Sequence, residues 1–300
     1  MSFSSEIKEN LSKITNLNNK ELVKYELIGY LISSNALYSK RKIVFSTVNE
    51  YNINRFSKLI SNLNILDFKI ELKGRTYKIS LPKIEEIKEI EYKENQITIV
   101  EKFKEDIRKI EKINTQEELA LKALIRGIFL GSGSVNNPEN KYHLEIILQN
   151  EENAGFIKEI LDKVDINVKI MKRKDIYFLY IKEGEEISKF LAFVGANLAV
   201  IKFEEIRVLR EIKNNINRKV NCETANLNKT VNAAVKQIEA IKKLQKTGEF
   251  DKLSEQLKEI AILRMENPDA SLIELGKMLK DPIGKSGVNH RLKQLEELGK

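Results

Sequence analysis

The chain has 300 residues, 42% hydrophobic and 32% charged, a globular composition that argues against extensive disorder. No apolar run approaches the roughly 18 residues of a membrane span, and the first residues, MSFSSEIKENLSKI, lack the apolar core of a secretory signal. Cys222 is the single cysteine, which excludes an internal disulfide and leads us to expect a reducing, cytoplasmic location.

The net charge of +8 favours a polyanionic partner. Residues 213–300 carry 17 basic and 12 acidic side chains, whereas residues 1–212 carry 35 and 32. The basic excess per residue is therefore higher in the C-terminal part, where we expect double-stranded DNA to bind.

The first two-thirds of the chain repeats one order of predicted elements. KYELIGYLISSNALY (residues 24–38) and KALIRGIFLGSGSVN (residues 122–136) each predict an apolar helix that ends in small polar residues. Residues 42–60 and 142–161 each predict a strand, a polar turn and an amphipathic helix.

A predicted β-hairpin with a short basic turn follows in each copy, at residues 66–81 and 166–181. The shared order of helix, strand, helix, hairpin and helix predicts a duplicated α+β unit. Its pseudo-repeats fall at about residues 1–105 and 115–212 of a domain that covers residues 1–212.

The segment between the copies, Glu89–Leu124, is rich in charge runs that indicate a solvated helix face or a connector. Thr115 and Glu118 have the spacing of a capping box, in which each side chain bonds to the other residue's backbone. The second apolar helix is therefore expected to begin near Gln116.

LIRGIFLGSGS (residues 124–134) resembles the LAGLIDADG helix of homing endonucleases. Those nucleases place one metal-binding acid at the end of each of two paired helices, since cleavage needs carboxylates to hold Mg²⁺. Aligned on the motif, these positions are Ser34 and Ser132. Serine is a poor Mg²⁺ ligand, so we expect no metal, no cofactor and no nuclease activity.

The two apolar helices contain glycines that a packing role explains, because glycine lets two helices approach closely. These glycines are Gly29, Gly127 and Gly131. The alternative is that GSGS is a plain turn. GSGS is not expected to bind phosphate, because the Lys and Thr that follow the glycines of a phosphate loop are missing. The two histidines, His143 and His290, have no metal-ligand partners at useful spacing.

Residues 213–229 are predicted to be a polar linker to an all-helical domain at residues 230–300. The segment NRKVNCETANLNKT (residues 217–230) is either a solvated linker or a contact to the DNA backbone or to the other domain. A helix with one apolar face follows, and a second helix has Ser254 as its candidate cap. That face comprises Val231, Val235, Ile238, Ile241 and Leu244.

Residues 270–298 have the layout of a helix-turn-helix. Ser271 and Glu274 form a capping box, residues 281–284 break the helix, and Ser286 is the expected cap of the second helix. The second helix has an apolar core face of Val288, Leu292 and Leu295 and a basic first half. The alternative is a helical hairpin that contacts protein. The residues predicted to bind DNA are Lys285, Ser286, Asn289, His290, Arg291 and Lys293.

Asn289 and Arg291 are the candidates for contacts to base edges, but they differ by about 200° around the helix. One of them must therefore point away from the groove. Asn289 is the better candidate, because it shares its side of the helix with Lys285 and Lys293.

Three stretches together resemble the WhiA family of bacterial regulators: LIRGIFLGSGSVNNPENKYHLEI (residues 124–146), NRKVNCETANLNKTVNAAVKQIEAI (residues 217–241) and SLIELGKMLKDPIGKSGVNHRLKQL (residues 271–295). The resemblance implies a degenerate LAGLIDADG domain followed by a helix-turn-helix domain. It also implies a non-enzymatic, nucleoid-associated DNA-binding protein with roles in transcription regulation, cell division, chromosome segregation and, in spore-formers, sporulation.

Two alternatives stay open on the residues alone. The near-balanced charge of residues 1–212 leaves room for a protein partner on the first domain, with the helix-turn-helix serving only to localise the protein. An active homing-type endonuclease is disfavoured by Ser34 and Ser132.

Overall fold

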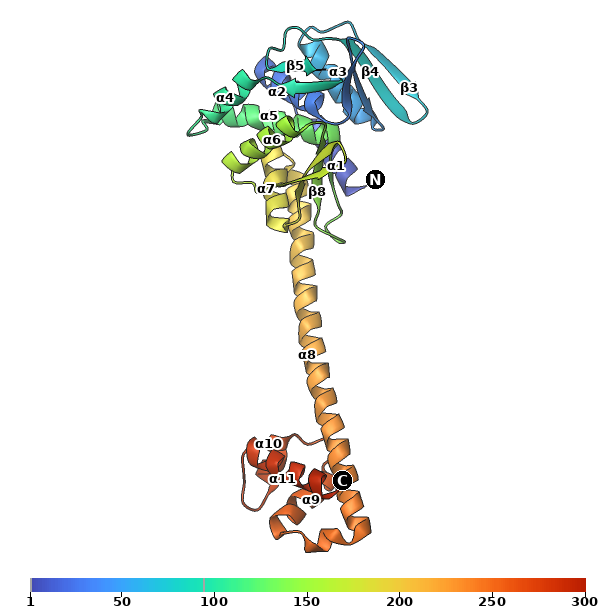
Figure 1. Ribbon diagram of the computed structural model, residues 1–300, viewed down its shortest axis with the longest axis vertical. Coiled ribbons are helices and arrows are strands. Elements are labelled where there is room, and N and C mark those ends of the chain that lie inside the picture. The colour runs from blue at the N-terminus through green and yellow to red at the C-terminus, as the bar shows by residue number, and fades with distance from the viewer. Residues whose placement is uncertain (1, 94) are drawn as a thin grey trace. The chain divides into compact units, whose positions relative to one another are not determined.

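A computed structural model describes residues 2–93 and 95–300 (Figure 1). The chain forms two compact units, Met1–Arg210 and Glu211–Lys300. Across the described residues, no helix combines the length and the apolar character that crossing a membrane requires.

The first unit contains the same arrangement twice. After α1 (Phe3–Ser12), the first copy comprises α2 (Lys20–Ile32), β1 (Ala36–Ser39), β2 (Lys42–Thr47), α3 (Glu50–Asn62), β3 (Lys69–Lys73) and β4 (Thr76–Pro82). The second copy comprises α5 (Thr115–Ser132), β7 (Gly133–Val135), β8 (Leu144–Leu148), α6 (Glu151–Lys163), β9 (Lys169–Arg173), β10 (Ile176–Ile181) and α7 (Gly184–Val194).

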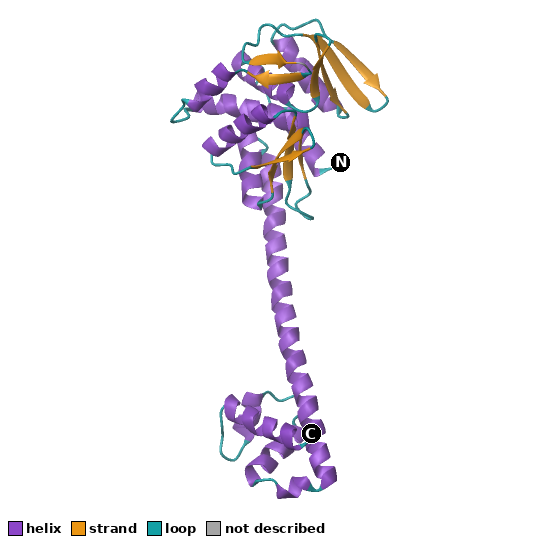
Figure 2. Ribbon diagram, in the orientation of Figure 1, coloured by secondary structure: helices purple, strands orange, loops and turns teal. Residues whose placement is uncertain are grey.

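Both sheets are antiparallel, with matching strand orders β1-β2-β4-β3 and β7-β8-β10-β9. The predicted duplicated α+β unit is therefore confirmed, with one short strand added after each apolar helix. Each sheet buries alternate residues, as in the pairs Phe45–Ile79 and Ile146–Leu179. These residues join the hydrophobic core of this unit. Figure 2 shows the strands and helices of the unit by secondary structure.

Two local expectations between the copies were wrong. Part of the predicted connector forms a hairpin of β5 (Ile90–Lys93) and β6 (Gln96–Ile99), and α4 (Glu101–Arg108) follows it. The hairpin has apolar residues at alternate positions, and Ile97 and Ile99 are fully buried. The charged residues of this segment made that alternation hard to recognise in the sequence.

The capping box of α5 lies one residue earlier than predicted. The Asn114 side chain accepts the backbone N–H of Glu117 at 3.0 Å, and the Glu117 carboxylate accepts the N–H of Asn114 at 2.9 Å. Asn114–Glu117 and Thr115–Glu118 have the same spacing, and asparagine is one of the best N-cap residues.

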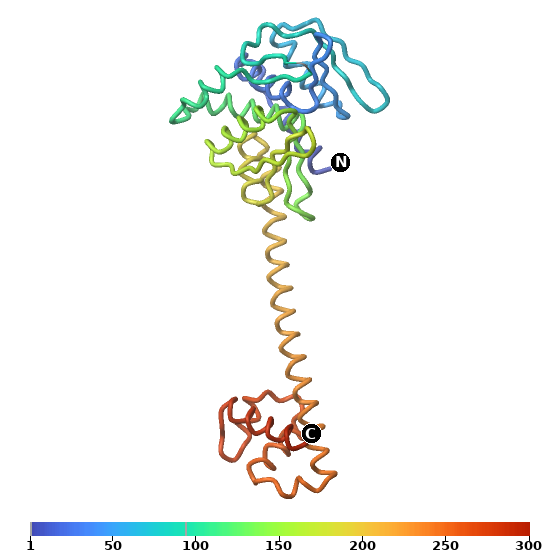
Figure 3. Tube along the Cα trace, in the orientation of Figure 1, coloured from blue at the N-terminus to red at the C-terminus, as the bar shows by residue number. Residues whose placement is uncertain are grey.

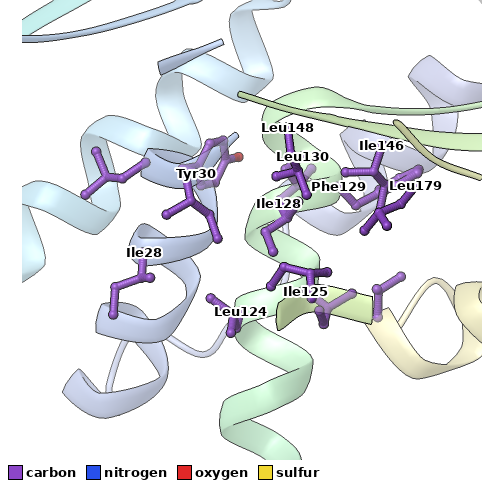
Figure 4. Close-up of a cluster of buried hydrophobic side chains, with 14 of the residues drawn as sticks. Ile28, Tyr30, Leu124, Ile125, Ile128, Phe129, Leu130, Ile146, Leu148 and Leu179 are labelled. Carbon is purple, nitrogen blue, oxygen red and sulfur yellow. The ribbon is translucent and has the colours of Figure 1, made fainter. Parts of the chain in front are cut away.

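The two apolar helices, α2 and α5, pack with their backbones in contact. A Cβ atom added at Gly29 would overlap the carbonyl oxygen of Leu124, and one added at Gly127 would overlap that of Glu26. An offset of 98 residues separates Gly29 from Gly127 and Glu26 from Leu124, so the two contacts are equivalent in the duplicated unit. Large side chains of both helices complete the core around this contact (Figure 4).

The second unit has its own hydrophobic core, built from the end of α8 (Asn197–Thr247), α9 (Glu255–Glu266), α10 (Leu272–Met278) and α11 (Lys285–Leu298). A short 3-10 turn, Glu249–Lys252, precedes α9. The predicted core face of α11 is confirmed, since Val288, Leu292 and Leu295 are fully buried.

Helix α8 runs without a break through residues 213–229, so the segment predicted as a linker ending in a helix cap is itself helical (Figure 3). The buried face of α8 also differs from the predicted one. Val231 and Val235 are exposed, whereas Ala234 and Gln237 are buried together with Ile241 and Leu244. The neighbouring face of α8 is buried, because that face packs into the core formed with α9 and α11. The spacing of apolar residues in the sequence did not distinguish between the two faces.

One of the three helix caps predicted in this unit has the expected hydrogen bonds. The capping box of Ser271 and Glu274 is confirmed, with bonds of 2.8 and 3.3 Å. Ser254 stands at the cap of α9 but its side chain makes no capping bond. The cap assigned to Ser286 was wrong: α11 begins at Lys285 after Gly284, so Ser286 lies inside the first turn.

We expect Gly127→Ala to destabilise the first unit by at least about 1–3 kcal/mol, because the added methyl group would push α2 and α5 apart. Gly155→Ala on α6 is the matched control, since nothing lies within 4 Å of a Cβ at that helical position. The control should gain about 0.5–1 kcal/mol. Urea unfolding measures both, and equal midpoints for the two variants would contradict the proposed helix contact.

Candidate nucleic-acid interface and metal-site positions

The two serines at the metal-site positions serve as structural hydrogen-bond donors. Ser132 is the last residue of α5, and Ser34 follows the end of α2. The Ser132 hydroxyl donates to the carbonyl of Ile147 at 2.6 Å, and the backbone N–H of Ser34 donates to the same oxygen at 3.1 Å. The fold thus brings the two positions together, and the Ser34 bond joins the first copy to a strand of the second.

The groups around these helix ends do not fit Mg²⁺. Within residues 2–93 and 95–300, no three His, Cys, Asp or Glu side chains are grouped so that they could hold a metal. Asn35 donates its amide to the carbonyl of Gly131 at 2.6 Å. Mg²⁺ is bound in proteins through carboxylates, so serine and asparagine at these helix ends do not suit it.

A lysine supplies positive charge near the end of α5. The Lys8 ammonium donates to the carbonyl of Leu130 at 3.3 Å, in the last turn, where the helix dipole is negative. Burial lowers the pKa of Lys8 to about 8. Sequence reasoning missed Lys8, because its spacing on α1 resembles that of any solvated lysine.

The buried charges of the first unit lie next to the glycine contact. Glu26 is fully buried on α2, between Arg55 on α3 and Arg126 on α5. Arg55 reaches both carboxylate oxygens, at 2.7 and 2.9 Å, and Arg126 bonds to one of them at 3.0 and 3.1 Å. Asn16 adds a further bond of 3.1 Å. This network ties both copies to each other.

Glu26 remains ionised in this network. Burial raises the pKa of Glu26, but the hydrogen bonds from Arg55 and the charge of Arg126 outweigh it and hold the pKa below its usual value. With both oxygens bonded to guanidinium groups, the carboxylate is a structural counter-ion. The sequence contains a signal for this buried ion pair: one charged residue stands inside each apolar run, Glu26 in KYELIGYLI and Arg126 in LIRGIFLG.

Glu26→Gln should lower the stability of the first unit by about 3–5 kcal/mol at neutral pH, because it leaves two buried guanidinium groups without a counter-ion. The folded pKa of Glu26 lies below the usual 4.5, so the network's stabilisation is complete above that pH and is lost as pH falls through the lowered value. The gap between wild type and variant should therefore shrink below about pH 4.5.

Chemical unfolding at several pH values measures this gap. Glu9→Gln, which removes an exposed pair with Lys13, is the control and should cost less than about 1 kcal/mol. A gap between Glu26→Gln and wild type that stays constant down to pH 3 would contradict the assigned charge of Glu26.

The helix-turn-helix places most of the predicted DNA-binding residues on one open surface of α11. Lys285, Ser286, His290 and Lys293 are exposed. Asn289 and Arg291 are half-buried, and their positions in the helix put them on opposite sides of the exposed face.

The first turn of α11 is open to an anion. No side chain caps this turn and it contains no acidic residue. Its first N–H groups therefore remain available to an external acceptor, and the helix dipole favours negative charge there. The acids Glu296 and Glu297 lie at the other end of the helix. The start of α11 thus combines free donors with basic side chains.

Comparisons with known proteins match both units. The model of the WhiA LAGLIDADG-like domain matches residues 121–213, and that of the WhiA C-terminal HTH domain matches residues 216–299. A protein of Clostridium tetani described as a probable cell division protein WhiA is 38% identical over 314 residues, which cover 99% of this chain and 97% of that protein.

A Clostridium acetobutylicum protein of the same description is 50% identical over 183 residues, which cover 61% of this chain and 58% of that relative. The crystal structure of full-length WhiA from Thermatoga maritima aligns with a TM-score of 0.59 at 29% identity, over 100% of this chain and 98% of that one.

Proposed function

This chain belongs to the WhiA family, and we propose that it is a DNA-binding protein of cell division that acts without nuclease activity. The observation that carries the proposal is the exposure of Lys285, Ser286, His290 and Lys293 over the first turns of α11, a helix whose apolar face of Val288, Leu292 and Leu295 is fully buried. In a helix-turn-helix, this part of the second helix enters the major groove.

The chemistry of these side chains suits DNA. Ser286 and His290 can exchange hydrogen bonds with base edges, whereas Lys285 and Lys293 suit phosphates. Arg291 lies on the opposite flank, where it suits a backbone phosphate. Asn289 lies at the edge of the exposed face, so its side chain contributes at the margin of the groove.

The biological role follows from this surface together with the family. Relatives described as probable cell division proteins support action in the cell cycle. A helix-turn-helix that reads base edges supports transcription regulation at the nucleoid, with chromosome segregation as a further role. Ser34 and Ser132, which bond to Ile147, support the absence of DNA cleavage.

The open face of the second sheet favours a protein partner in addition. The outward positions of β8 and β10 include Ile147, Phe178 and Tyr180, which are half-buried, and Ile176 and Met171 beside them are 44% and 47% exposed. Aromatic residues and methionine are enriched at protein interfaces. A scaffold role for the first unit is therefore the second candidate.

The full-length chain should bind duplex DNA with an affinity that falls linearly with salt on a double-logarithmic plot, because each neutralised phosphate releases counterions. The same DNA should stay intact with Mg²⁺ or Mn²⁺. Fluorescence anisotropy at several salt concentrations and gel analysis of the DNA measure the two outcomes. Absence of DNA binding at low salt would overturn the DNA-binding proposal and favour the scaffold role. Metal-dependent nicking of the DNA would overturn the proposal that the protein has no nuclease activity.

His290→Ala should weaken binding to a site selected from a random duplex library by about 1–3 kcal/mol, and binding to random DNA much less. Lys293→Ala should weaken both about equally, since phosphates carry no sequence information. Competition binding with the selected and random duplexes separates the two effects. Equal losses on both duplexes for His290→Ala would mean that this face of α11 does not read bases.

A further inference from the structure

A cavity of about 280 Å³ opens at the surface of the second unit, between α8 and the helix-turn-helix. Lys229, Thr230 and Gln237 of α8 line one side of it, and Arg264, Lys285 and Asn289 line the other. A water molecule occupies about 30 Å³ of liquid volume, so the cavity admits a group much larger than a single water. Two of its lining residues also belong to the surface of α11 that we propose binds DNA.

Arg264 brings a buried positive charge to this cavity. Its side chain is 2% exposed, and one terminal nitrogen donates to the carbonyls of Pro268 and Ala270 at 3.3 and 2.7 Å. The buried Nε atom has no hydrogen-bond partner. Among the described residues, no carboxylate oxygen lies within 4 Å of the guanidinium nitrogens. A buried cation without a counter-ion is costly, and an anion in the cavity would relieve that cost.

The other lining groups also suit an anion. Gln237 is 3% exposed and its Oε1 atom is buried without a partner, and rotation of the amide by 180° would present N–H donors there. Lys229 and Lys285 add two ammonium groups, whereas the Thr230 hydroxyl already donates to the carbonyl of Asn226 at 3.0 Å. The named lining residues contain three cations and no acid. This composition fits a compact anion with several acceptor oxygens, as a phosphate has.

We propose that this cavity holds one phosphate of the DNA backbone beside α11, clamped between Lys229 of α8 and Arg264 and Lys285 of the helix-turn-helix. The inference rests on the DNA-binding function proposed above. It gives the segment at residues 217–230 a role in binding: the end of that segment contacts the DNA backbone. Because phosphate contacts fix a protein's register on the duplex, the clamp would set where α11 enters the groove.

Lys229→Ala in the full-length chain is the main test, because Lys229 is exposed and its loss leaves the core intact. It should weaken binding to selected and random duplexes alike, by about tenfold, and reduce the salt slope by about one. Lys242→Ala is the matched control: Lys242 is also exposed on α8 but lies about 220° around the helix. The control should change affinity less than about twofold.

Methylphosphonate substitution identifies the bound group. Uncharged methylphosphonates are placed one at a time along the selected site, and binding is measured for wild type and Lys229→Ala. One position should weaken wild type strongly and leave the variant almost unaffected, because the variant has already lost that contact. Arg264→Gln, with its fold checked by circular dichroism, should show the same insensitivity at the same position.

The outcomes separate the two proposals. Wild type that binds no DNA would overturn the proposed function itself. DNA binding with equal effects of Lys229→Ala and Lys242→Ala, or with no coupled methylphosphonate, would overturn only the clamp. Inorganic phosphate that raises the melting temperature of wild type but not of Lys229→Ala, without any effect of the variant on DNA binding, would show a free-anion site and also overturn it.

Discussion

The first unit depends on the contact between α2 and α5 at Gly29 and Gly127. The two backbones come so close there that a Cβ atom at either glycine would overlap a carbonyl oxygen of the facing helix. This approach brings Glu26 of one helix within hydrogen-bond distance of Arg126 on the other. It also brings the two helix ends together, so that the following sheets meet at Ile147. The contact therefore fixes how the two copies are joined.

The same contact explains how a nuclease-like scaffold persists without the acids of a nuclease. Helix packing here needs glycines, aliphatic side chains and a compensated buried charge, and none of these depends on an acid at the helix end. Serine meets the structural requirement at position 132, because its hydroxyl bonds to a strand carbonyl of the second copy. A carboxylate there would repel that carbonyl oxygen unless a cation lay between them.

Separate cores allow the two units to serve different functions. The helices of the second unit enclose Ile241, Val288 and Leu292 in a core of their own. Its outer surface is then free to hold the basic start of α11. Helix α8 contributes both to that core, through Ile241 and Leu244, and to the phosphate cavity that we propose, through Lys229 and Gln237. One helix thus couples the packing of the domain to the geometry of its proposed DNA contact.

The sequence determined the features that depend on local spacing. The repeated order of elements, the hairpins, the capping box at Ser271 and the buried face of α11 follow from residue periodicity and turn chemistry, and all are found in the structure. The missing acids at Ser34 and Ser132 and the basic first half of α11 are likewise visible from the residues alone. Each of these depends on neighbours within one helix or one hairpin.

Only the tertiary structure decided the features that join distant residues. The Glu26 network links residues far apart in the chain, and the cavity at Arg264 needs α8 to lie beside α9, α10 and α11. The buried side of α8 and the place of Asn289 beside the cavity follow from that packing as well. A helix pattern gives each residue an angle around one axis, but which angles are buried is set by the helices that pack against it.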